Sequence, residues 1–534
     1  MTGLFGIVSK DDCSRTLFFG TDYHSHLGTQ YGGMSTMNDD GFIDNAIHNI
    51  TTGQFKSKFH NEYKGMEGRM GIGAISDRDA QPLRLFGQFG AFALVTCGRA
   101  GNMDALAKMI VKEGGTFSAM MDGNEINMTE LVANILNRGG DPLKGIENVF
   151  DKIDGSCSLL MMTKDGIYAA RDSMGRTTLA LGRNIDGECA VASETCAFPN
   201  LGFKTYRFLK PGEVVLMNES GVRTMRKGSD EKMQICSFYW IYTGYPASYY
   251  DGINAEAVRY NCGAIMAEMD ADLKVDVVMG MPDSGIAHGI GYAKKRQEMG
   301  WQKLPGFFNE QLTKFVERNM SALQGAGENV SEVLARLLAE QNPALDDALK
   351  GLASPAFERG ILKYTDGYSR SYTPPDQRKR DEVAHYKQIA IGAILSNGWN
   401  ELERNHAEGR VIVISEDSIV RNTQLRKSIQ KLWDWGAKEI HVRPGCPPLT
   451  SPCEYLNATK KHDELVARRA IMDMEGMDVE DISAYVDHTT PDYEEMIRWI
   501  EKDLNVNSVK YPTIDQMAAA IGLPREKLCV DCWL

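Results

Sequence analysis

The stretch that decides the fold runs Val411-Ile412-Val413-Ile414-Ser415-Glu416-Asp417-Ser418-Ile419-Val420-Arg421-Asn422-Thr423. Its first four residues are a continuous apolar run, which is typical of a parallel strand covered on both faces. Two adjacent carboxylates follow, then a polar loop, and then a helix that we expect over Gln424 to Trp435. Lys274 to Met281 is a second strand of the same kind. The second half of the chain is therefore predicted to be an α/β domain with a parallel sheet.

The polar part of this stretch suits a phosphorylated sugar. The free N–H groups and the dipole at a helix start favour an anion. The loop residues that would bind this substrate are Ser418, Ile419, Val420, Arg421, Asn422 and Thr423. Glu416 and Asp417 can hold ribose hydroxyl groups and, through Mg2+, a pyrophosphate, because hard cations prefer oxygen ligands. An unrelated α/β domain with an acidic strand end is the alternative interpretation.

The whole stretch resembles the phosphoribosyl-pyrophosphate (PRPP) loop of type I phosphoribosyltransferases, and in particular that of the amidophosphoribosyltransferase family. Further blocks agree in order: Ile241-Tyr242 through Asp251-Gly252-Ile253, Pro282-Asp283-Ser284-Gly285, Ser369-Arg370-Ser371-Tyr372, and Gly436 to Arg443 with Pro447-Pro448. The chain departs from the family pattern at two positions, where Glu416 replaces the usual Asp and Asn422 the usual Gly. Binding of a sugar phosphate is expected, and turnover is left open.

The resemblance implies roles for residues in these blocks. Asp283, Ser284 and Gly285 would line the pyrophosphate side of the substrate site. Arg370 and Tyr372 would close a lid over PRPP, within a long loop expected over Asp366 to Arg380. An exposed arginine without a ligand role is the alternative for Arg370.

The first half of the chain is predicted to combine strands and helices. Short apolar runs are Leu4 to Val8, Ala91 to Val95, Cys157 to Met162 and Gly212 to Met217, with helical spacing in Met103 to Val111 and Met128 to Leu136. Blocks at Gly3 to Val8, Arg171-Asp172 and Ala192 to Ala197 resemble the N-terminal-nucleophile glutaminase domain of the same family. The resemblance implies a four-layer sandwich over 1–235, followed by a type I phosphoribosyltransferase domain over 236–534.

A helical insertion is expected at about 305–360 of the second domain. Apolar residues there follow the spacing of an amphipathic helix, at Val330, Val333, Leu334, Leu337 and Leu338. We interpret the segment as an inserted helical pair that packs on the domain or on a second subunit. A ligand-binding role is the alternative.

The residues that would hydrolyse glutamine have been replaced. Thr2 stands where the family has its catalytic cysteine, and the other replaced positions are Tyr31, Ser76, Cys97 and Met128, although Gly98 remains. An arginine and an aspartate normally bind the ends of glutamine, and an oxyanion donor contributes roughly 3 kcal/mol to the transition state. We therefore predict a degenerate class II glutamine amidotransferase domain. Thr2 acting as the nucleophile for another amide is the alternative.

Four cysteines form the second chemical motif. Cys529 and Cys532 are a C-x-x-C pair, which alone is a weak signal. Together with Cys236 and Cys453 they match the places of the cluster ligands in the iron-sulfur-containing branch of the family. Four thiolates suit a [4Fe-4S] cluster, with Zn2+ or free thiols as alternatives. Another close pair, His24 and His26, is interpreted as structural hydrogen bonding rather than a metal site.

Composition limits the setting and the partners. The 534 residues carry a net charge of −13, which argues against a nucleic-acid partner. Eleven cysteines are too few for a disulfide scaffold of this length and indicate a reduced compartment. Neither a secretory signal nor an apolar run long enough for a membrane span is evident, so a cytoplasmic location is expected. The family resemblance adds the expectation of a homo-oligomer.

These features predict a transferase that joins ammonia or a small amine, rather than glutamine nitrogen, to PRPP with release of pyrophosphate, which is chemistry of the purine-biosynthesis type. Glu416, Asp417 and Arg370 would be the catalytic residues, with Thr2 at the degenerate nucleophile position. A protein that supplies the amine is a further candidate partner. The rival hypothesis is a non-catalytic paralogue that binds PRPP or a nucleotide as a regulatory or scaffold protein.

Overall fold

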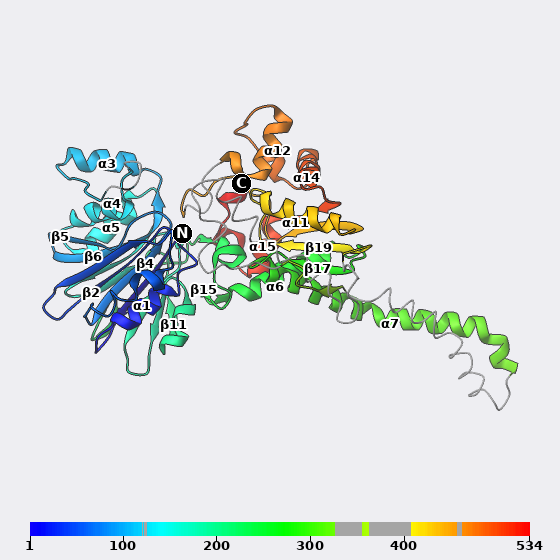
Figure 1. Ribbon diagram of the computed structural model, residues 1–534, viewed down its shortest axis with the longest axis horizontal. Helices are drawn as coiled ribbons and strands as arrows, with labels where there is room; N and C mark the ends of the chain where they lie inside the picture. Colours follow the sequence, from blue (N-terminus) through cyan, green and yellow to red (C-terminus); the bar gives the residue numbers. More distant parts are fainter. Residues whose placement is uncertain (120, 122–124, 326–354, 362–406, 457–461) are drawn as a thin grey trace.

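The computed structural model describes residues 1–119, 121, 125–325, 355–361, 407–456 and 462–534. Figure 1 shows a sheet-rich body formed by the first half of the chain beside a second body formed by the second half. A long helix projects from the second body, and both labelled ends of the chain lie where the two bodies meet. The ends of the sequence therefore take part in the junction.

Two antiparallel sheets form the first body. Their strand orders are β11-β9-β10-β1-β4-β2-β3 and β13-β12-β8-β7-β6-β5. The strands are β1 (Thr2–Val8), β2 (Tyr31–Met37), β3 (Ile43–Asn49), β4 (Met70–Ser76), β5 (Leu83–Gly87), β6 (Gly90–Ala100), β7 (Gly155–Thr163), β8 (Gly166–Ala170), β9 (Ala180–Arg183), β10 (Cys189–Ala192), β11 (Lys204–Phe208), β12 (Val214–Asn218) and β13 (Gly221–Arg226). The four apolar runs predicted as strands all lie in these sheets.

Helices cover both outer faces, which gives the predicted four-layer sandwich. Against the first sheet pack α1 (Ser14–Asp22) and α2 (Phe55–Phe59), and against the second α3 (Met103–Lys112), α4 (Met128–Asn137) and α5 (Pro142–Lys152). Between the sheets lies a buried apolar layer that includes Leu4, Ile72 and Leu160. Burial of this layer holds the two sheets together.

The second body is an α/β unit around a parallel sheet of order β18-β17-β19-β20-β21. Its strands are β17 (Val277–Gly280), β18 (Ala356–Phe357), β19 (Val411–Glu416), β20 (Glu439–Pro444) and β21 (Ser508–Val509). Its helices are α6 (Ala255–Met269), α7 (Gly285–Gly325), α11 (Thr423–Asp434), α12 (Val466–Glu475), α13 (Ser483–Val486), α14 (Pro491–Leu504) and α15 (Ile514–Ile521). Ile412 and Ile414 pack in the cluster formed with α11, α12 and α14, whereas Val413 packs in the cluster that includes residues of α6 and α7. The continuous apolar run of β19 is explained by burial on both faces.

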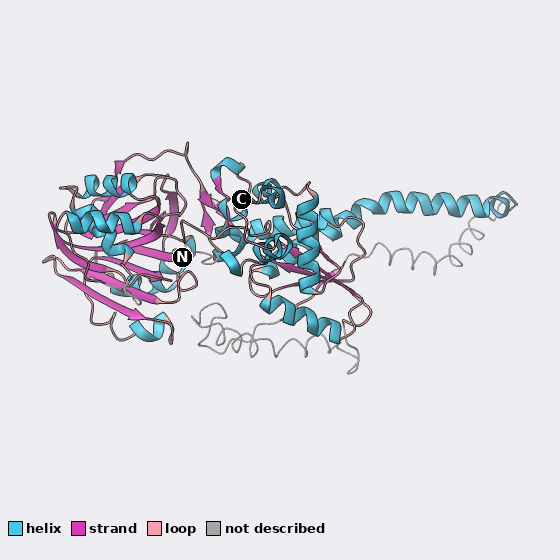
Figure 2. Ribbon diagram, turned by 90° about the horizontal axis from the view of Figure 1, so that it is seen from above, coloured by secondary structure: helices cyan, strands magenta, loops and turns pink. Residues whose placement is uncertain are grey.

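The long helix in Figures 1 and 2 is α7, which runs unbroken from Gly285 to Gly325. The predicted start of the insertion, at about 305, therefore lies in the middle of α7, which begins next to the parallel sheet. The predicted helix around Val330 to Leu338 and the lid around Asp366 to Arg380 lie outside the described residues. Among the helices that are described, none combines the length and apolar character that a membrane span needs.

The buried carboxylate of Glu194 links the two bodies. His26 places Nε2 2.9 Å from it, and from the second half Ser248 donates a hydrogen bond at 3.2 Å and Tyr250 donates another. The neighbouring His24 contacts the carbonyl of Gly20 through Nδ1 at 2.9 Å and accepts from the N–H of Glu194 at 3.2 Å. The structural interpretation of the histidine pair is therefore confirmed.

The ionised form of Glu194 contributes to stability. Burial opposes the charge, but His26 and the hydrogen bonds outweigh it and hold the pKa of Glu194 at about 2. A carboxyl group whose pKa is lowered by folding stabilises the folded state at pH values above its ordinary pKa. That contribution is lost as pH falls from about 4.5 to about 2.

We expect Glu194→Gln to lower the free energy of unfolding by about 3 kcal/mol at neutral pH. The deficit relative to wild type should shrink as pH falls below about 4.5, because wild type loses the same contribution there. Urea unfolding at a series of pH values measures this. Glu494→Gln removes an exposed, paired carboxylate of α14 and serves as the control. A constant deficit at every pH would contradict the assignment.

Candidate functional site

The acid pair lies at the carboxyl end of β19, beside the turn that follows β17. Ser415 is in register with Gly280, so the two strands deliver their following residues to one place. Ser284 donates a hydrogen bond to Oδ2 of Asp417, and Ser418 donates one to Oδ1 at 2.8 Å. A Cβ at Gly285 would lie 2.6 Å from the carbonyl oxygen of Ser415, so only glycine fits this approach. The structure thus brings the predicted segment Asp283-Ser284-Gly285 to the acid pair.

Burial makes the acid pair receptive to positive charge. Burial and the charge of Asp417 raise the pKa of Glu416 well above its ordinary value. Burial also raises the pKa of Asp417, against the hydrogen bond from Ser284 and the positive charge of Arg259. Two adjacent carboxylates in a medium of low polarity destabilise each other's charged form. Glu416 and Asp417 are therefore the residues that could hold a hard divalent cation.

The predicted phosphate loop turns at Asn422, which adopts φ +64° and caps α11. Its Nδ2 donates to Oδ2 of Asp503 in α14 at 2.8 Å, and Arg426 forms an ion pair with the same carboxylate. Arg421 forms an ion pair with Glu464. Two side chains of the loop are thus held by acidic partners that the sequence pattern did not indicate. Arg370 and Tyr372, the predicted lid residues, lie outside the described residues.

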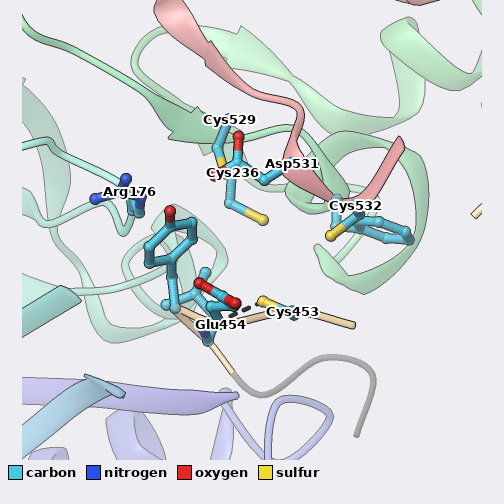
Figure 3. A pocket seen from close by; sticks show the side chains of 10 residues that line it. Arg176, Cys236, Cys453, Glu454, Cys529, Asp531 and Cys532 are labelled. Carbon is cyan, nitrogen blue, oxygen red and sulfur yellow. Dashed lines mark hydrogen bonds between the residues drawn. The ribbon is translucent and has the colours of Figure 1, made fainter. Parts of the chain in front are cut away.

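The four predicted cysteine ligands line one pocket at the junction of the two bodies, as Figure 3 shows. The short strands β14 (Ile235–Cys236) and β22 (Leu528–Cys529) pair in parallel and place Cys236 opposite Cys529. Cys532 belongs to a short helical turn, and Cys453 follows the Pro447-Pro448 segment. Outside the pocket, Tyr249–Tyr250 and Ile253–Asn254 form the hairpin β15–β16. Chain segments that are almost 300 residues apart therefore meet at the pocket.

Three of the four cysteines of this pocket have raised pKa values, which favours their protonated form. Burial raises the pKa of Cys236 well above its ordinary value and that of Cys529 to about 11. A hydrogen bond with Cys453, followed by burial, raises the pKa of Cys532. Binding of a metal would therefore release protons. Among the described residues, no three His, Cys, Asp or Glu side chains are grouped tightly enough to hold a single ion.

The positions of the degenerate amide site also come together. Thr2 and Tyr31 are both in register with Ser76, from β1 and β2 on either side of β4. The thiol of Cys97 interacts with the N–H of Thr2, and burial raises the pKa of this thiol to about 11. The amino group of Met1 lies 2.8 Å from Asp77. The structure therefore brings Thr2, Tyr31, Ser76 and Cys97 to one end of β4.

The last of these positions, Met128, begins α4. Its N–H donates to Oδ1 of Asp79 at 3.1 Å, and burial raises the pKa of Asp79. Gly98 keeps φ +146°, and a Cβ there would lie 1.9 Å from the carbonyl oxygen of Ser156. Gly98 is thus required by the packing of β6 on β7, whatever its role in chemistry.

The chain is similar to known proteins over most of its length. Residues 68–200 match a family model described as a glutamine amidotransferase domain. The amidophosphoribosyltransferase of Bacillus subtilis (strain 168) is 27% identical over 87% of this chain and 83% of its own. That of Methanocaldococcus jannaschii is 25% identical over 100% of this chain and 96% of its own.

Two solved structures share the fold across nearly the whole chain. One is glutamine PRPP amidotransferase from B. subtilis complexed with ADP and GMP, with a TM-score of 0.72, 24% identity and coverage of 99% of this chain and 96% of that chain. The other is described as the allosteric regulatory enzyme of purine biosynthesis, with a TM-score of 0.73, 23% identity and coverage of 99% and 95%. Both halves of the predicted fold class are confirmed.

The left-handed backbone of Asn422 yields a stability prediction. We expect Asn422→Ala to be less stable than Asn422→Gly by about 1–2 kcal/mol, because alanine lacks the freedom of glycine to adopt the left-handed backbone conformation. Both variants lose the hydrogen bond to Asp503, so the difference between their free energies of unfolding reports only the cost of the left-handed backbone conformation. Denaturant unfolding of the two proteins measures it, and equal midpoints would show that the loop does not hold this conformation in solution.

Proposed function

Because this chain belongs to the amidophosphoribosyltransferase family, we propose that it transfers an amine to PRPP with release of pyrophosphate, and that the amine is free ammonia or a small amine rather than glutamine nitrogen. The observation that carries the proposal is the contact between Ser284 and Asp417. It joins the turn after β17 to the acid pair after β19, and ligands of open parallel sheets bind at such carboxyl ends.

The proposed reaction exchanges one bond for another at the anomeric carbon of PRPP. The nitrogen lone pair forms the new C–N bond, the bond from that carbon to the pyrophosphate oxygen breaks, and the nitrogen loses a proton. Glu416 and Asp417 would orient the ribose hydroxyl groups and hold Mg2+, which supplies positive charge to the departing pyrophosphate. Ser284 and Ser418 hold Asp417 in place through its two oxygens.

Loss of glutamine hydrolysis in the first domain is the second part of the proposal. Of the positions that would bind or activate glutamine, none carries an arginine or an aspartate: they are Thr2, Tyr31, Ser76, Cys97 and Met128. These features support a domain that keeps the fold without the activity, and they disfavour Thr2 as a nucleophile.

The rival function, a non-catalytic protein that binds PRPP or a nucleotide, is favoured by one specific observation. Asn422 and Arg421 of the phosphate loop are held by Asp503 and Glu464. Carboxylates this close to the loop disturb the exact placement of a phosphate that transfer requires, which lowers turnover more than it lowers binding. Turnover distinguishes the two proposals.

Pyrophosphate release is the test of the transferase. We expect purified, anaerobically handled protein to release pyrophosphate from PRPP and Mg2+ with ammonium and not with glutamine. Asp417→Asn should lower the rate on the order of 100-fold, as loss of a charge-stabilising group does. Asp434→Asn, an exposed site at the end of α11, is the matched control. Release with glutamine would refute the loss of glutaminase, and PRPP binding without any release would favour the rival.

We also propose that Cys236, Cys453, Cys529 and Cys532 hold a [4Fe-4S] cluster. The residues fit the group in chemistry, because the pocket offers four cysteines. Bound between the two bodies, the cluster would add folding free energy to the junction.

We expect Cys529→Ser to lose most of the iron and the visible thiolate-to-iron absorbance of the anaerobic protein. Cys262→Ser replaces a buried cysteine of α6 outside the pocket and should keep both. Iron and acid-labile sulfide analysis measures the outcome. A zinc-containing, colourless wild-type protein would establish the alternative metal.

A further inference from the structure

Arg176 brings a buried positive charge from the first body to the cysteine pocket. It lies in the loop between β8 and β9, is 7% exposed and lines the pocket together with the four cysteines. Figure 3 shows it on the side of Cys529 and Cys236. The N–H of Cys236 donates to the carbonyl of Arg176 at 3.1 Å. The arginine is thus tied to the strand that carries one of the cysteines.

The guanidinium of Arg176 is held in place by neutral groups, and its positive charge is not paired with a carboxylate. It stacks on the ring of Tyr455 at 3.7 Å and donates weakly to neutral oxygens of Gln234 and Gly155, at 3.2 and 3.4 Å. Its Nε is buried and has no acceptor, and within the described part of the chain it forms no ion pair with a carboxylate. A buried cation of this kind is costly unless an anion accompanies it.

A cluster held by the four cysteines would place a further anion in the pocket that Arg176 lines. Of the ten described residues that line it, Arg176 is the one cation, whereas Glu454 and Asp531 already contribute negative charge. An iron–sulfur cluster bound by four thiolates carries net negative charge and becomes more negative on reduction. A nearby cation lowers the energy of both states and of the reduced state more.

We propose that Arg176 is the counter-charge of the cluster: it stabilises the bound cluster and raises its reduction potential. This inference rests on the proposed cluster and goes beyond it, because it assigns control of the reduction potential to a residue of the first body. Arg176 is a positioning residue here, because it acts on the cofactor through charge and not on substrate.

The test is a potentiometric titration of the anaerobic full-length protein, followed by electron paramagnetic resonance. We expect Arg176→Met to shift the reduction potential to a lower value and to shorten the lifetime of the cluster in air several-fold. Arg176→Lys retains the charge and should stay close to wild type in potential. Arg99→Met is the matched control, because Arg99 donates to the carbonyl of Cys453 at 3.0 Å but does not line the pocket.

Each outcome decides between the alternatives. A cluster retained in Arg176→Lys but absent from Arg176→Met supports the counter-charge as strongly as a lowered potential does. A potential unchanged in Arg176→Met, a shift equal to that of Arg99→Met, or loss of the cluster from both Arg176 variants would overturn it. A wild-type protein without iron would instead refute the proposed cofactor, and pyrophosphate release would be judged separately.

Discussion

The parallel pairing of Ile235–Cys236 with Leu528–Cys529 is the interaction on which the junction depends. Two residues on each side are a small sheet, and the C-terminal segment supports it with other contacts. Trp533 stacks on Phe238 with ring centroids 5.1 Å apart, and the carbonyl of Cys532 accepts from the N–H groups of Thr450 and Ser451. The segment thereby places cysteines from three parts of the second half around one pocket, against Arg176 of the first.

This constraint also relates the candidate sites to one another. The buried cluster that includes Cys236 and Trp533 extends to Met1 at one end and to Cys446, which follows β20, at the other. Met1 precedes the degenerate amide site, and Gly445 beside Cys446 donates its N–H to the carbonyls of Glu416 and Asp417. The apolar packing of the junction therefore extends from Met1 to Cys446, and backbone hydrogen bonds continue from there to the acid pair.

Much of the fold was predictable because local patterns determine it. The apolar run of β19 and the polar turn after it indicate a buried parallel strand, and the structure places Glu416 and Asp417 where that pattern puts them. The partners of Asn422, Arg421 and Arg176 were not predictable. Asp503 is 81 residues from Asn422, and an acidic residue on a helix surface carries no local signal of what it will meet. Such pairs depend on how α14 packs beside α11, which only the assembled core decides.

The four-layer sandwich has a further consequence, for how a protein changes over generations. Its stability comes from layers such as Leu4, Ile72 and Leu160, which lie between the sheets. Thr2 and Tyr31, at the ends of the inner strands β1 and β2, are only partly buried and pair with β4 through backbone groups, which most side chains permit. Substitutions there cost little folding free energy, so selection for a folded chain does not oppose them. A domain built in this way can lose its catalytic activity through neutral drift and still be retained because the neighbouring domain packs against it.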